Sequence, residues 1–248
     1  MTNPGRRGYR ATMSVDPEAL SISLRALAAK KSADNGVVAA LSAVTVACVE
    51  LFGVTGSGVM IADEQDVTRY VAASDGSGRY LELAESSTGQ GACTEAFVEN
   101  RIVASRDVCT DPRWPELAVA MRGHGVHAVL GVPVRLGAIP VGTLDVYRDH
   151  PHDWDDSERR ALARYGDVVE TTLTAALQAH TAGELADQLQ YALDYRVVIE
   201  RAVGYLMASE RIDATVAFNR LRRAARSGRT KIGSVAEHLL STGRLPAR

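Results

Sequence analysis

The chain has 248 residues, enough to bury the core of one large domain or of two small ones. Apolar residues make up 46% and charged residues 23%, a balance that excludes a disordered chain. No apolar run approaches the ~20 residues that a membrane-spanning helix needs, and the basic N-terminus lacks the apolar stretch of a secretory signal. Three widely spaced cysteines without a CxxC pair fit a reducing cytoplasm better than a disulfide framework or a zinc site.

The net charge of −2 hides an uneven distribution. Residues 1–183 carry 17 basic and 23 acidic side chains, whereas residues 184–248 carry 11 basic and 7 acidic ones. Within residues 211–231, seven basic side chains stand against a single acid, Asp213. This separation predicts an acidic body with a basic C-terminal part that meets a polyanion, although a solvated helix face gives the same charge pattern.

The N-terminal third begins as a flexible arm at residues 1–14 and continues as two helices. Asp16-Pro17 is a favourable helix start, because proline is tolerated at the first helical position. A second helix is expected to begin after Ser32 or Asp34 and to end at Gly53, a typical C-terminal stop.

The middle of the chain mixes strands and short helices. Apolar runs separated by turn residues predict an antiparallel arrangement, with a hairpin at Gly137. Residues 80–86 fit either a short helix or a loop. The strands are expected at 58–63, 67–74, 103–105, 126–134 and 138–147, and the helices at 93–99 and 116–124.

From Asp155 onward the pattern is helical, with apolar residues from Leu162 to Leu193 recurring mostly every three or four positions. Such a run suits a connector helix or a parallel two-stranded coil. Two short helices follow, capped by Asp213 and Ser234. The predicted fold is an α+β domain (15–177), then a helical stalk leading into an all-α, three-helix domain (178–248).

The C-terminal part contains three characteristic segments: residues 196–207 read RVVIERAVGYLM, residues 217–225 read AFNRLRRAA and residues 232–236 read IGSVA. With them the C-terminal part resembles the ANTAR domain, a three-helix module of bacterial transcription antitermination regulators. The family pattern usually has lysine where this chain has Val203, which removes one expected phosphate contact. The resemblance implies binding of RNA stem-loops, in which basic side chains contact phosphates.

The residues expected to bind RNA are mostly basic. Arg222 and Arg226 share a helical face because they are four positions apart, and neither is expected to be buried in the core. Gly204 lies within a helix and is expected to allow close approach of another helix or of RNA. Leu206, Met207, Phe218 and Leu221 are assigned to the core. The RNA-binding set is Arg196, Arg201, Gly204, Arg222, Arg223, Arg226, Arg229 and Lys231.

The first part of the chain contains four segments in a characteristic order: GQGACTEA at residues 89–96, DVCTDPRW at 107–114, GVHAVLGVPV at 125–134 and GTLDVY at 142–147. With them this part resembles a GAF domain, an α+β fold that senses small molecules or other signals. A GAF sensor followed by an ANTAR domain is typical of actinobacterial regulators. The resemblance names no ligand or cofactor; Cys93 and His127 are the weak candidates for sensing a small-molecule or redox signal.

The leading hypothesis is a non-catalytic cytoplasmic regulator in which the GAF domain controls RNA binding by paired ANTAR domains. A parallel homodimer is expected through the apolar helices at both ends of the GAF domain. Its expected contacts include Leu20, Leu24, Leu27, Leu173 and Leu177. One alternative is a DNA-binding regulator with a helix-turn-helix-like module. Another is a redox enzyme built on the GAF domain, since some GAF proteins are free methionine sulfoxide reductases, but the other cysteine settings expected there are not matched by Cys48 and Cys109. Nucleotide-hydrolysis and hydrolase motifs are not found.

Overall fold

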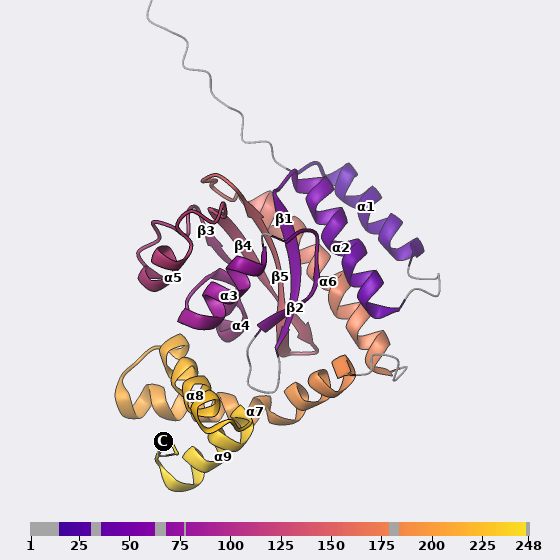
Figure 1. Ribbon diagram of the computed structural model, residues 1–248. Helices are drawn as coiled ribbons and strands as arrows, with labels where there is room; N and C mark the ends of the chain where they lie inside the picture. Colours follow the sequence, from indigo (N-terminus) through magenta and orange to yellow (C-terminus); the bar gives the residue numbers. More distant parts are fainter. Residues whose placement is uncertain (1–14, 31–35, 63–67, 77, 179–183, 247–248) are drawn as a thin grey trace, which may run out of the picture.

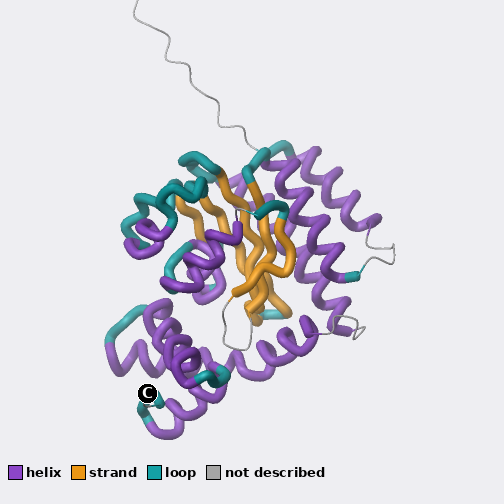
Figure 2. The backbone as a smooth tube through the Cα atoms, viewed as in Figure 1, coloured by secondary structure: helices purple, strands orange, loops and turns teal. Residues whose placement is uncertain are grey.

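The computed structural model describes residues 15–30, 36–62, 68–76, 78–178 and 184–246 (Figures 1 and 2). Within these residues five strands form one antiparallel sheet in the order β2-β1-β5-β4-β3. The strands are β1 (Gly56–Ala62), β2 (Thr68–Ala73), β3 (Val103–Ser105), β4 (Ala128–Leu136) and β5 (Ile139–Arg148).

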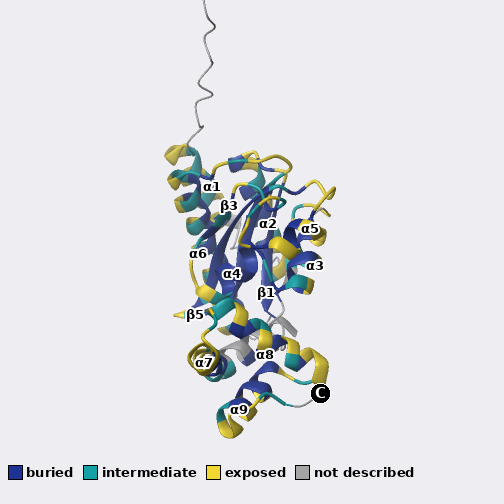
Figure 3. Cartoon of the chain, turned by 90° about the vertical axis from the view of Figure 1, so that its left-hand side faces the viewer, coloured by how far each residue is buried: buried dark blue, intermediate teal, exposed yellow. Residues whose placement is uncertain are grey.

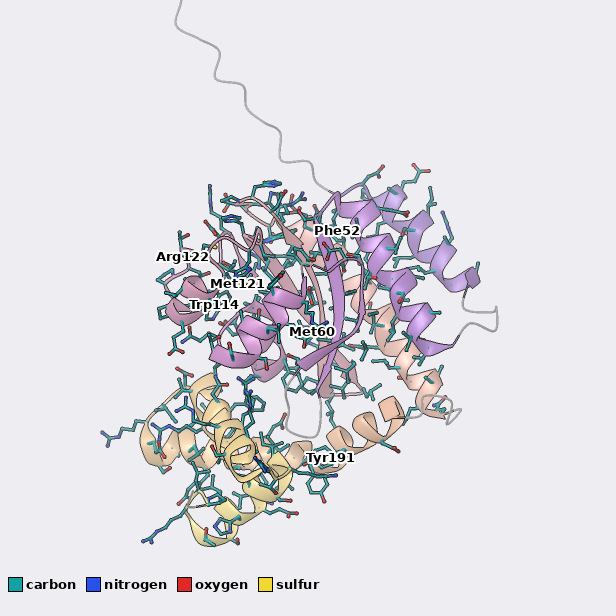
Figure 4. All side chains as sticks on the ribbon, viewed as in Figure 1. Phe52, Met60, Trp114, Met121, Arg122 and Tyr191 are labelled. Carbon is teal, nitrogen blue, oxygen red and sulfur yellow. The ribbon has the colours of Figure 1, made fainter. Side chains whose placement is uncertain are left out.

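Helices cover both faces of the sheet (Figure 1). The helices on one face are α1 (Pro17–Lys30), α2 (Val37–Phe52) and α6 (Asp156–Gln178), and those on the other are α3 (Gly78–Thr88), α4 (Ala92–Glu99) and α5 (Pro115–Ala120). Side chains of a strand alternate between faces, so Val59 and Ile61 of β1 join the core under α2 and α6. Met60 joins Trp114 and Met121 in the second core, under α3–α5 (Figure 4).

The central strands β1 and β5 lie unusually close at Gly142. It pairs with Ile61, and a Cβ added there would lie 2.0 Å from the carbonyl oxygen of Met60. Only glycine fits at this position. The β4–β5 hairpin turns at Gly137, which has a φ of 65° and so adopts a left-handed conformation that other residues rarely take.

The C-terminal helices are α7 (Glu184–Glu210), α8 (Ala214–Gly228) and α9 (Ile232–Thr242). The Asp213 carboxylate caps α8 by accepting a hydrogen bond from the Val216 amide at 2.7 Å. Buried apolar side chains from these helices form a third core, which also takes in Ala62 of β1 and Phe97 of α4. The C-terminal helices therefore pack directly on the α+β part of the chain, as Figure 3 also shows for α8 beneath α4.

Most of the predicted elements are confirmed, with small shifts at their ends. The hairpin at Gly137 and the end of α2 at Gly53 are found as expected. Residues 80–86 belong to a helix, α3, and the helix expected at 116–124 is shorter, because α5 ends at Ala120. The arm at residues 1–14 lies outside the described residues.

The apolar period from Leu162 does not leave a face for a coiled coil along α6. Leu162, Tyr165, Val169 and Leu173 are fully buried in the core beneath the sheet. The interpretation of this run as a connector helix or a two-stranded coil is therefore wrong for α6, since the sheet and α2 cover it. Leu193 lies in α7, where its side chain is outside the described residues.

Leu173 is thus a core residue, and truncating it should destabilise the fold. We expect Leu173→Ala to lower the free energy of unfolding by about 2–5 kcal/mol, because it removes a fully buried side chain and leaves a cavity. Leu177→Ala, at a half-buried position of the same helix, serves as the control and should cost less. Chemical denaturation measures the free energy of unfolding of both variants. Equal losses of stability in the two variants would contradict the core assignment of Leu173. A lower molecular mass of Leu173→Ala at unchanged stability would instead support the dimer-contact interpretation.

Candidate nucleic-acid interface and sensor site

The basic residues of the C-terminal helices fall into an exposed set and a contacting set. Arg201 is exposed on α7 and Arg223 on α8. Arg229 ends α8 in a left-handed conformation, and the Lys231 ammonium lies 4.9 Å from the centre of the Tyr191 ring. The Arg196 side chain lies outside the described residues. These exposed cations are arranged so that an anionic partner can reach them.

Arg222 and Arg226 both contact the α+β domain, Arg222 from a buried position and Arg226 from an exposed one. Arg222 Nη2 donates to the backbone carbonyl oxygen of Ser86 at 3.2 Å, and Arg226 Nη1 donates to the same oxygen at 2.9 Å. Arg222 is only 5% exposed. The expectation that neither arginine is buried is therefore wrong for Arg222: it is covered by the sensor domain.

The position of Ser86 explains why two cations meet there. Ser86 lies in the last turn of α3, whose final carbonyl groups have no partner within the helix and form the negative end of the helix dipole. Two guanidinium groups satisfy one of these carbonyls. Asn219 Nδ2 donates to the Gly89 carbonyl oxygen at 2.7 Å, just beyond the same helix end.

Thr215, Asn219, Arg222 and Arg226 form a single polar stripe along α8, which we call the α8 docking face. They are spaced four, three and four positions apart, which places them on one side of a helix. Besides the contacts to Ser86 and Gly89, the Thr215 hydroxyl lies 3.4 Å from Glu99 Oε1 of α4. Beside the stripe, the Phe97 and Phe218 rings meet edge to face with centroids 6.0 Å apart.

The Gly204 region of α7 is open to solvent. A Cβ at Gly204 would meet no atom within 4 Å, so no helix of the described chain packs against it. Tyr205 is 40% exposed and Met207 is 38% exposed, so the assignment of Met207 to the core is wrong. Val203, at the usual lysine position, packs partly buried against the core of α7–α9.

On the sensor side, the space between the sheet and α3–α5 is filled by the second core. Glu85, like Glu95 and Asp145, is a buried carboxyl group beside it. Its two oxygens accept hydrogen bonds from the amides of Cys93 at 3.2 Å and Thr94 at 2.7 Å, at the N-terminus of α4. Gly91 is required here, because a Cβ would lie 2.2 Å from the Glu85 carboxyl carbon. Burial raises the pKa of Glu85 to about 7, even though these amides oppose the shift.

Cys93 and His127, the two sensing candidates, differ in accessibility. Cys93 is fully buried, and burial together with the nearby Glu85 carboxylate raises the pKa of its thiol well above the usual value. A thiolate is therefore disfavoured at this position. His127 is partly exposed, and its Nδ1 lies 3.0 Å from Asp107 Oδ1. The two residues belong to different surroundings and do not form one site.

Sequence reasoning missed Glu85 and Asn219. Glu85 occurs among other polar residues of α3, and helical periodicity gave no sign that its carboxyl group is buried. The glycine pair at 89 and 91 was the available signal: Gly91 makes room for Glu85, and a Cβ at Gly89 would lie 2.4 Å from Asn219 Oδ1. Both glycines therefore mark close contacts of α3 and the segment after it.

Comparison with protein families accounts for both parts of the chain. The model of the GAF domain matches residues 37–173, which is more than half of the chain. The chain belongs to the GAF domain family. The model of the ANTAR domain matches residues 187–240, so that the chain is a GAF–ANTAR protein with the regulator architecture expected from its sequence. A search of curated proteins found no match.

Solved structures support the GAF fold. A free methionine-R-sulfoxide reductase from Neisseria meningitidis is 18% identical, with a TM-score of 0.54, covering 67% of this chain and 96% of its own. The GAF domain of an Acinetobacter phosphoenolpyruvate-protein phosphotransferase is 15% identical, with a TM-score of 0.52, covering 65% of this chain and 96% of its own. The phycocyanobilin-bound GAF domain of a cyanobacterial phytochrome is 15% identical, with a TM-score of 0.54 and coverages of 65% and 97%. At these identities the likeness concerns the fold alone. Within the described residues, no helix combines the length and the apolar character that crossing a bilayer requires.

The buried Glu85 carboxyl group should make stability depend on pH. Its pKa is about 7 in the folded chain against an ordinary 4.5, so the folded state keeps a proton that the unfolded state releases between these values. The free energy of unfolding should therefore fall as pH rises from about 4.5 to 7, by on the order of 3 kcal/mol, and level off above pH 7. Urea denaturation at a series of pH values measures this; Glu85→Gln should flatten the fall, whereas Glu116→Gln at an exposed position should not. A profile unchanged by Glu85→Gln would contradict the assignment.

Proposed function

We propose that this GAF–ANTAR protein is a signal-responsive, non-catalytic regulator that binds RNA hairpins through its ANTAR domain and thereby controls transcription termination. The GAF domain acts as the sensor. The exposed cations Arg201, Arg223, Arg229 and Lys231 supply phosphate contacts, with Arg196 of the same helix α7 added from the sequence pattern. Gly204, open on α7, leaves room for RNA to approach the helix backbone.

The observation that carries the proposal is the convergence of Arg222 and Arg226 on the Ser86 carbonyl. A phosphate oxygen is charged and is a stronger acceptor for a guanidinium group than a neutral carbonyl. Both arginines therefore have a better partner available on RNA, provided that α8 leaves the GAF domain. The sensor domain in this way controls how many arginines the ANTAR domain presents.

The helix α3 gives the signal a direct route to this contact. Leu81 and Ala84 of α3 lie in the second core, Glu85 caps α4, and Ser86 accepts the two arginines. A ligand or a redox signal that moves α3 by a small amount changes the geometry of the docking contact. The docked conformation then corresponds to low RNA affinity and the released one to high affinity.

Catalysis by the GAF domain finds no support in the cysteine that the redox alternative requires. Cys93 is fully buried and its raised pKa keeps it a thiol. A nucleophilic cysteine needs the thiolate form and access to the substrate. The redox-enzyme alternative is therefore not part of the proposal.

A second copy of the chain is the proposed partner at the face formed by α1 and α2. Ile22, Val38 and Val46 are about half exposed there, beside a groove of about 710 Å³ between the two helices. Leu20 and Leu24, expected in the dimer contact, are half-buried against the GAF core, and Leu27, expected there too, is buried within it. A dimer would present two ANTAR domains to two hairpins and gain affinity through effective concentration.

RNA binding should strengthen when the docking contact is broken from the GAF side. Val98 of α4 is partly buried and packs against the core of α7–α9. Val98→Asp therefore places a charge in the contact while every residue of the ANTAR domain stays unchanged. We expect at least tenfold tighter binding of RNA stem-loops recovered from total cellular RNA by crosslinking. Raising salt from about 50 to 200 mM should weaken this binding by about tenfold or more, because released counterions drive it.

Three comparisons decide this experiment. Val119→Asp, at an exposed position of α5 that is not part of the α8 docking face, should bind RNA like the unaltered chain. Adding Arg222→Ala and Arg226→Ala to Val98→Asp should weaken binding by roughly 1–3 kcal/mol at unchanged helicity. If hydrogen exchange shows that α8 is released and no RNA binds, the proposed function is wrong; if duplex DNA competes equally well, the partner is DNA.

Dimerisation is tested separately by light scattering on the full chain. We expect a dimer mass at micromolar concentration, and Val46→Asp should give the monomer, because an unpaired charge in an apolar contact is costly. Val119→Asp should leave the dimer intact. A monomer mass for the unaltered chain would remove the second copy from the proposal.

A further inference from the structure

Three side chains of different chemistry meet near the start of β4, away from the ANTAR domain. Asp107, Cys109 and His127 bring a carboxylate oxygen, a sulfur and an imidazole nitrogen within 4.8 Å of one another. Two of them come from the loop after β3 and the third precedes β4. Sequence reasoning had treated His127 and Cys109 separately, because they are 18 positions apart along the chain.

The backbone holds these segments together independently of the three side chains. The Val108 amide, between two of the three residues, donates to the His127 carbonyl oxygen at 2.9 Å. The His127 amide donates to the Arg148 carbonyl oxygen at 2.8 Å, which fixes it to the end of β5. The Asp107 carboxylate accepts from the Cys109 amide at 3.1 Å, and this local turn orients both side chains. The arrangement is therefore built before any ligand arrives.

We propose that Asp107, Cys109 and His127 bind a divalent transition metal ion, of which Zn²⁺ fits the donors best. Thiolate, imidazole and carboxylate are all zinc ligands, and the sulfur and nitrogen donors disfavour Mg²⁺ and Ca²⁺, which take oxygen ligands. On binding, the Cys109 thiol loses its proton to solvent and its sulfur coordinates the ion.

The distances suit a tetrahedral ion. With zinc–ligand bonds of about 2.0–2.3 Å, the ligand atoms of a tetrahedral site lie roughly 3.3–3.8 Å apart. His127 Nδ1 and Asp107 Oδ1 lie 3.0 Å apart, so an ion between them requires a separation only a few tenths of an ångström larger. The three ligand atoms already lie within 4.8 Å of one another, and small side-chain rotations bring them to the tetrahedral separation.

The site is accessible and leaves one coordination position open. The His127 side chain is 34% and the Asp107 side chain 15% exposed. A hollow of about 320 Å³ reaches Asp107 from the surface, between Arg106 and Pro151. The Arg106 guanidinium is turned to Asp153 at 2.6 Å and does not occupy Asp107. Three protein ligands with solvent access leave the fourth position to water or to a ligand of the ion.

Co²⁺ titration of the chelator-treated full chain under reducing conditions tests the proposal. We expect one equivalent to bind, with the visible bands of tetrahedral Co²⁺ and a thiolate charge-transfer band in the near ultraviolet. Zn²⁺ should displace Co²⁺ and remove both. Cys109→Ser should abolish the charge-transfer band, and His127→Ala and Asp107→Asn should each weaken the affinity at least tenfold.

His124→Ala is the matched control, because His124 is exposed and lies three residues before His127, outside the cluster. It should bind Co²⁺ like the unaltered chain. Circular dichroism tests whether each variant is folded. If one of the other variants does not fold, Asp107→Asn, the mildest substitution, still tests the site. A band that persists in Cys109→Ser, equal losses in His124→Ala and His127→Ala, or no band in the unaltered chain would overturn the proposal. RNA binding does not enter this test, so its outcome is independent of the proposed function.

Discussion

The C-terminal carbonyl groups of α3 are the point on which the arrangement of the two domains depends. A helix end needs partners for its last carbonyls, and in this chain Arg222 and Arg226 reach the one at Ser86 from α8. Asn219 binds the Gly89 carbonyl beyond the helix end, so that the segment after α3 is also held by the ANTAR domain. Beside these polar contacts, the rings of Phe97 and Phe218 pack against each other and add an apolar contact between the two domains.

The same short helix takes part in the core of the sensor domain. Leu81 is fully buried under the sheet, and Glu85 is bound to the first amides of α4, which itself packs on α8. A change of protonation or packing around Glu85 therefore acts within one residue of the carbonyl that binds both arginines. The coupling between sensor and RNA-binding domain needs no long pathway, because one helix belongs to both.

Sequence patterns predicted the domain order and most elements, because local signals decide them: the turn at Gly137, the stop at Gly53 and the cap at Asp213. They did not predict what covers an apolar face. The period from Leu162 is the same for a coiled coil and for a helix buried beneath a sheet. Arg222 was expected at the surface because an arginine on a helix is usually exposed. Its partner Ser86 lies 136 residues away in the sequence, and a contact over this separation does not show in the local sequence pattern.

The docked arrangement is tested most directly by joining α4 to α8 across the contact between Glu99 and Thr215, whose side-chain oxygens lie 3.4 Å apart. Glu99→Cys and Thr215→Cys, combined with Cys109→Ser, are treated with a short bis-maleimide cross-linker and analysed by mass spectrometry. The account predicts rapid cross-linking within one chain, and a cross-linked chain that binds RNA stem-loops at least tenfold more weakly than the untreated one. A pair that does not cross-link, or a cross-linked chain with undiminished RNA affinity, would contradict it.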